Sequence, residues 1–102
     1  MLTVIQKSLY FAKGFDALKA MADSLQIPFY IYLHAEQGEL KTGRYNDMGQ
    51  KILMWADSAR VMLINGMKEG ERQEMYRDVI HFHEKGQRFL ADKLIKYVKI
   101  DN

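Results

Sequence analysis

Apolar residues recur at helical spacing in three long stretches of this 102-residue chain, and this periodicity constrains its fold more than any other feature. The first stretch begins at a capping box, Thr3-x-x-Gln6, and should end before Pro28, whose ring disfavours helical geometry in the residue before it. Its predicted buried side is formed by Phe11, Phe15, Leu18, Ala22 and Leu25. This stretch therefore predicts a long amphipathic helix.

Two more helices are predicted further along the chain. One is capped by Asn46 or Asp47 and should stop at Asn65-Gly66, with a last part, VMLING, that is apolar nearly all round. The other runs from about Glu71 to about Lys99 and is the longest. A helix end that is apolar on every side indicates a central position or cover by another chain.

The stretch between the first two helices is ambiguous. Phe29, Ile31 and Leu33 alternate with more polar residues, which is typical of a strand, and Gln37-Gly38 could turn the chain into a hairpin. However, Pro28 at a first helical position and Gly38 just past an end also fit a short helix. We favour the helix because the neighbouring stretches are predicted to be helical.

These patterns predict one domain, residues 1–102, folded as an all-α antiparallel bundle of three long helices plus one short element. The alternative is an α+β domain in which residues 29–45 form a hairpin against the helices. The chain has no linker, repeat or low-complexity tract that would mark a second domain.

The segment MYRDVIHFHEKGQRF, residues 75–89, concentrates two of the three histidines. On an ideal helix they point in different directions: His83 joins the apolar stripe, and His81 lies with Arg77, Asp78 and Lys85 on the charged side. Asp78-x-x-His81 with Glu74 and Glu84 resembles half of a carboxylate–histidine metal set, but no second copy exists. We therefore predict a solvated face, no metal site and no cofactor.

Arg77 and His83 are spaced like the Arg-x(4–6)-His signature of the HEPN ribonucleases, which are small helical domains. The resemblance covers seven residues of the chain. It implies that Arg77 would stabilise a phosphate and that His83 would transfer protons during RNA cleavage. A partly buried, hydrogen-bonded His83 is the competing interpretation, and we favour it.

The end of the chain is basic. Five cations, opposed between residues 85 and 99 only by Asp92, could track a phosphate backbone: Lys85, Arg88, Lys93, Lys96 and Lys99. A helix C-terminus also favours such charges, and no aromatic residues interleave with them on the same face of the helix. Nucleic-acid binding is therefore an alternative function rather than the main one.

The main functional prediction is a small, non-catalytic protein that binds a macromolecular partner, as an adaptor, chaperone-like binder or inhibitor, and that self-associates as a homodimer. Seven methionines and 12% aromatic residues suit an adaptable interface, and no catalytic constellation is evident. The candidate partner-binding residues are Tyr30, Tyr32, Val61, Leu63 and Ile64. The absence of cysteine, of a secretion signal and of a long apolar run predicts a cytoplasmic protein without membrane contact.

Overall fold

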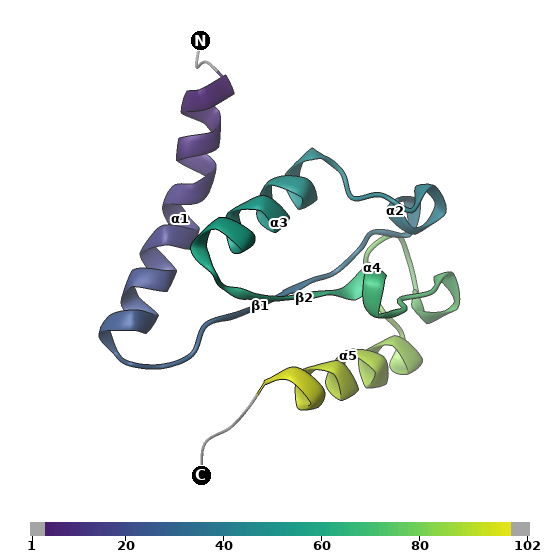
Figure 1. Cartoon of the computed structure of the whole chain (residues 1–102). Coiled ribbons are helices and arrows are strands. Elements are labelled where there is room, and N and C mark those ends of the chain that lie inside the picture. Colours follow the sequence, from purple (N-terminus) through teal and green to yellow (C-terminus); the bar gives the residue numbers. More distant parts are fainter. Residues whose placement is uncertain (1–3, 99–102) are drawn as a thin grey trace.

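The computed structural model describes residues 4–98, with side chains from residue 13 onward. It contains eight elements (Figure 1): α1 (Val4–Ser24), β1 (Tyr30–Leu33), α2 (Gln37–Thr42), α3 (Asp47–Ala59), β2 (Met62–Asn65), α4 (Gly66–Glu69), the 3-10 helix η1 (Gln73–Met75) and α5 (Glu84–Tyr97). The predicted cap at Thr3 and the predicted end at Lys99 lie outside the described residues.

The centre of the fold is a parallel pair of strands. β1 and β2 pair in the register Tyr30↔Met62 to Leu33↔Asn65, and the chain between them forms α2 and α3. Parallel strands need such a crossover because the chain must return to the end of the sheet at which β1 began before β2 can pair with it in the same direction. In Figure 1, α3 and α5 lie on opposite sides of this strand pair. The chain is thus a mixed α+β protein.

The prediction of an all-α bundle is therefore wrong, and the α+β alternative matches better. The predicted hairpin is also wrong, since β1 pairs with β2 and the segment after it enters α2. The apolar run VMLING, residues 61–66, which the pattern predicts as a helix end, instead contains the strand β2, Met62–Asn65. A short apolar run bounded by a turn signal is typical of a strand in a parallel sheet, and the helical neighbourhood misled the interpretation.

α3 begins as predicted and ends six residues early. The Asn46 side chain caps it by accepting a hydrogen bond from the Gly49 N–H at 2.9 Å. Arg60 follows in the left-handed conformation, with φ of 57°, and turns the chain into β2. The α3 side chains of Ile52 and Leu53 pack on a core cluster of Leu33, Ala35 and Tyr45.

The long fourth helix predicted from Glu71 is the largest error. Residues 70–83 form turns and η1, and α5 begins only at Glu84, with His83 as its N-cap. Gly70, with φ of 113°, ends α4 in a conformation that favours glycine. Downstream, the Asp78 carboxylate accepts backbone N–H groups that a helix would need, which is how aspartate competes with helical structure.

Within the part of α1 whose side chains are described, residues 13–24, Phe15 and Asp16 contact α3. Phe15 lies 5.2 Å from the Trp55 ring, centroid to centroid, and Trp55 Nε1 donates to Asp16 at 2.8 Å. Ala22 is buried, but Leu18 and Leu25, which the helical pattern placed in the core, are more than half exposed. Figure 1 shows α1 extending beyond the strand pair and α3. No helix within residues 4–98 combines the length and the apolar character needed to cross a membrane.

Candidate functional site

The candidate site is a tight loop between η1 and α5 that carries Asp78 and His81. Tyr76 and Phe82 form an antiparallel bridge at its base. Within the loop, the Arg77 N–H donates to the His81 carbonyl at 2.7 Å. Both bridge residues are buried, so they hold the ends of the loop while its tip stays exposed.

Asp78 and His81 form a carboxylate–imidazole pair. His81 Nδ1 lies 2.9 Å from both Asp78 oxygens, and Asp78 Oδ1 also accepts the N–H groups of His81 at 2.7 Å and Ile80 at 3.0 Å. The two backbone bonds fix the carboxylate on the same turn that presents the imidazole. The pair is therefore built by four residues of contiguous chain, with the spacing Asp-x-x-His.

The protonation states follow from the donors and acceptors. The backbone N–H groups of His81 and Ile80, followed by the His81 ring, lower the pKa of Asp78 to about 2. A carboxylate can only accept, so His81 Nδ1 carries a proton and donates it to Asp78, which leaves Nε2 as the ring nitrogen outside the pair. No hydrogen-bond partner for this Nε2 is seen within the described part of the chain, and the His81 side chain is 59% exposed.

A groove of about 520 Å³ lies beside the pair, between β1 and α5. Its walls include the apolar side chains of Phe82, Leu90 and Leu94, and His81 and Arg77 also line it. A larger groove, of about 720 Å³, lies along α5 near His83 and does not include the pair. The smaller groove is the better candidate because it combines apolar walls with an imidazole whose Nε2 is unengaged.

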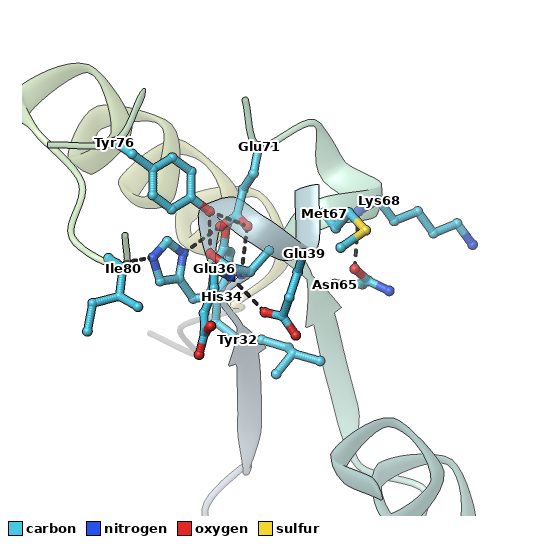
Figure 2. A network of polar contacts seen from close by, with 12 residues as sticks. Tyr32, His34, Glu36, Glu39, Asn65, Met67, Lys68, Glu71, Tyr76 and Ile80 are labelled. Atoms are coloured by element: carbon cyan, nitrogen blue, oxygen red, sulfur yellow. Dashed lines mark hydrogen bonds and ion pairs between the residues drawn. The ribbon is translucent and has the colours of Figure 1, made fainter. Parts of the chain in front are cut away.

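Close to this loop, the buried carboxylate of Glu71 forms polar contacts with several segments of the chain (Figure 2). Its side chain has no exposed surface. Oε2 accepts from Tyr32 Oη at 2.8 Å and contacts His34 Nδ1 at 2.9 Å, and Oε1 accepts from the Ala35 N–H at 2.9 Å. Tyr76 Oη donates to the Ala35 carbonyl and lies 3.4 Å from Oε1. A buried charge is tolerated when it is surrounded by donors in this way.

His34 connects this network to the Asp78–His81 loop. Its Nε2 lies 2.6 Å from the Ile80 carbonyl oxygen, and its ring stacks on Tyr76 and meets the edge of Phe82. The hydrogen bond with Glu71 raises the pKa of His34 above its usual value, against the opposing effect of burial. Burial of the tyrosine hydroxyls raises the pKa of Tyr32 and of Tyr76, and the neighbouring Glu71 raises both pKa values further.

The structure brings the predicted partner-binding residues together on the strand pair. Tyr32 is opposite Ile64 in the register, and Ile31 is opposite Leu63. Ile64 is 3% exposed and Leu63 packs on the core cluster, while Tyr30 and Val61 are half-buried at the strand starts. Tyr32 is engaged by Glu71.

The predicted basic surface lies on α5, and its described members are opposed by carboxylates. Lys85 pairs with Glu74 at 3.1 Å and Arg88 with Glu84 at 2.6 Å. Lys93 and Lys96 lie 3.9 and 3.7 Å from Glu69. Lys99 lies outside the described residues.

The Arg77 and His83 pair of the ribonuclease alternative lies at the two ends of the loop region. Arg77 is exposed, whereas both ring nitrogens of His83 contact the backbone: Nδ1 accepts from the Lys85 N–H, and Nε2 donates to the Glu74 carbonyl. Over the described residues, no group of three or more histidines and carboxylates could hold a metal ion.

Sequence reasoning missed the roles of His34 and Glu71 and assigned Asp78 and His81 to a helix face. The Asp-x-x-His spacing was available as a signal, because an aspartate often accepts N–H groups two and three residues later in a turn. His34 and Glu71 carry no local signal, since they are 37 residues apart. Comparisons with protein-family models, with curated proteins and with solved structures found no match for this chain.

Proposed function

We propose that the chain carries the base half of a hydrolytic site, with His81 as general base and Asp78 as the group that orients it. The observation that carries this proposal is the Asp78–His81 pair, with Nδ1 bound to a fixed carboxylate and His81 lining an apolar groove. A nucleophile, a base and an orienting carboxylate form the recurring unit of acyl transfer. The proposed reaction is hydrolysis of a carboxylic ester.

The chemistry at His81 is a proton transfer in two directions. Nε2 takes the proton of a hydroxyl as its oxygen attacks the ester carbonyl, and the imidazolium that forms is stabilised by Asp78. The same proton then passes to the alkoxide that leaves when the tetrahedral intermediate collapses. The apolar walls at Leu90 and Leu94 favour an apolar acyl group.

No serine or threonine with a described side chain lines the groove, so the attacking hydroxyl proposed here comes from water. Ser24, Thr42 and Ser58 each donate to a main-chain carbonyl of their own helix, and none of them lines the groove. A hydroxyl carried by another polypeptide segment would complete the site more efficiently, because it would be held in place.

Hydrolysis of p-nitrophenyl butyrate by the full chain tests the proposal. His81→Ala should lower the rate above background by about 100-fold or more, since general base catalysis contributes about that much. Asp78→Asn should also lower it, because an amide NH2 would replace one carboxylate oxygen beside Nδ1 and the negative charge that stabilises the imidazolium would be lost.

The matched control is His83→Asn, which keeps an N-cap side chain on α5 and changes the other histidine of the same segment. Its rate should stay near that of the parent. A folded His81→Ala variant that hydrolyses the ester as fast as the parent would contradict the proposal.

A second candidate function, binding of a macromolecular partner, is favoured by the exposed apolar side chains of α1 and the turn after it. Leu18, Met21, Leu25 and Ile27 are all more than half exposed. A cluster of large apolar side chains on a helix and its following turn is typical of a protein interface. We propose a second copy of the chain as the partner.

A further inference from the structure

His34 contacts the loop between η1 and α5 that carries Asp78 and His81. Its ring bridges two groups that differ in kind: a buried carboxylate on one side and a main-chain carbonyl of the loop on the other. Since the Ile80 carbonyl can only accept, Nε2 must carry a proton. Nδ1 lies 2.9 Å from Glu71 Oε2, which also accepts from Tyr32, and this contact raises the pKa of His34.

The Ile80 carbonyl belongs to the peptide group that also contains the His81 N–H. That N–H donates to Asp78 Oδ1 at 2.7 Å. One rigid peptide plane is thus held from both sides, by His34 at its oxygen and by Asp78 at its nitrogen. If the plane rotates, the His81 N–H no longer points at the carboxylate and the imidazole moves with it.

We infer that His34 is the positioning residue of the Asp78–His81 pair: its Nε2–H holds the Ile80–His81 peptide plane, and Glu71 holds His34. This inference rests on the proposed function for its catalytic meaning, but the positioning itself is a property of the loop. His34 does not reach the substrate through Nε2, because that nitrogen is occupied by Ile80.

The surroundings of His34 explain why one side chain can do this. The ring is stacked on Tyr76 at 5.3 Å and meets Phe82 at 4.3 Å, so that its plane is fixed by the two residues that close the loop. The remaining anchor of the loop tip is the Gln37 N–H, which donates to the Val79 carbonyl at 2.9 Å. The segment from the end of β1 to the start of α2 therefore presents a side chain and a backbone donor to adjacent carbonyls of the loop.

Two substitutions separate the two contacts of His34. In His34→Gln, the side-chain amide occupies the place of Nε2 and can still donate to Ile80. In His34→Asn, the shorter amide occupies the place of Nδ1 and can reach only Glu71. Both variants lose the aromatic stacking, so each is the control for the other.

The readout is the nuclear magnetic resonance signal of the His81 ring in the full chain, namely the Nδ1–H proton and the nitrogen shifts that report the tautomer. We expect His34→Gln to keep the signal of the Asp78-bound ring and His34→Asn to lose it. Ester hydrolysis should fall by about 100-fold in His34→Asn, the cost of a misplacement of roughly 1 Å, and far less in His34→Gln.

Equal signals in the two variants would overturn the inference. If His34→Asn is unfolded by circular dichroism, His34→Gln decides alone: a folded variant that has lost the His81 signal contradicts the inference, and one that keeps it supports it. Unfolding of both variants also counts against it, because the ring would then support the core rather than the loop. A parent without esterase activity whose His81 signal responds as expected would remove the proposed function and leave the positioning role intact.

Discussion

Glu71 shows how a single residue can organise a site that it does not line. Its carboxylate is fully enclosed and receives hydrogen bonds from Tyr32, His34 and Ala35. Removing one partner of a buried charge costs more than the pair contributes, because the remaining charge is left without compensation. The residue therefore makes the conformation of the β1 end and of the loop mutually dependent.

The protonation of His34 makes the free energy of unfolding depend on pH. Its pKa in the folded chain is raised above the unfolded value of about 6.5, chiefly by Glu71, and Ile80 and Glu39 act in the same direction. The groups that face it are Glu71, Tyr32 and Tyr76, with Arg77 and His81 along the same groove. The stabilisation is complete below the unfolded pKa and is lost as the pH rises through the folded pKa.

We therefore expect the difference in free energy of unfolding between the parent and His34→Gln to shrink as the pH is raised above about 6.5. Urea denaturation at several pH values measures this difference, and the other titrating groups cancel in the comparison. A difference that grows with pH would show that His34 is held in its neutral form.

At the scale of elements, the junction between β2 and α4 determines whether Glu71 fits. A Cβ atom on Gly66 would lie 2.5 Å from Glu71 Oε2 and 2.7 Å from the Leu33 carbonyl oxygen. Gly66 thus leaves the space in which the carboxylate approaches the end of β1. Gly66 follows β2 and is the first residue of α4. Its lack of a side chain therefore permits close packing and is not required for a turn.

Gly66→Ala should lower the free energy of unfolding by about 1–3 kcal/mol, the usual cost of inserting an atom into a packed site. Gly38→Ala is the control, because no atom lies within 4 Å of its added Cβ and it sits inside α2. This control should stabilise the chain slightly, since alanine favours helix over glycine. Equal effects of the two changes in chemical denaturation would contradict the packing argument.

The same scale shows what the sequence could reveal. The cap at Asn46 and the periodicity that follows it were sufficient to predict the start of α3, because both signals are local, but not its end at Ala59. The residues that decide against a helix over 71–83 act at a distance: Glu71 is held by β1, and the loop tip is held by His34 and Gln37. The Asp78–His81 pair was visible as a spacing, but its geometry depends on these remote contacts.

At the scale of the whole molecule, the chain exposes more surface than a folded protein of its size. Its accessible surface is 7663 Å², whereas a monomer of 12.0 kDa exposes about 6,000 Å². The radius of gyration, 15.2 Å, also exceeds the value of about 13 Å for a compact domain of this length. Two-stranded parallel sheets are rare alone, since both faces are normally covered.

These quantities lead us to expect an assembly in solution. Light scattering after size exclusion should give a mass above 12.0 kDa, and the double change Leu18→Glu with Met21→Glu should reduce it to the monomer value. Ala20→Glu, on the opposite side of α1, should leave the mass unchanged. A monomeric parent would contradict self-association, and a parent that forms a complex only with another protein would replace the second copy by that partner.

The long separations within the polar network also determine when the site forms. Tyr32 meets Glu71 across 39 residues, and His34 meets Ile80 across 46. Such contacts form only after the crossover has closed and the strands have paired, because loop closure costs entropy before any contact compensates it. The Asp78–His81 loop is therefore among the last parts of the chain to reach its final geometry during folding. In a newly synthesised chain, the strands pair before Asp78 and His81 reach their final arrangement.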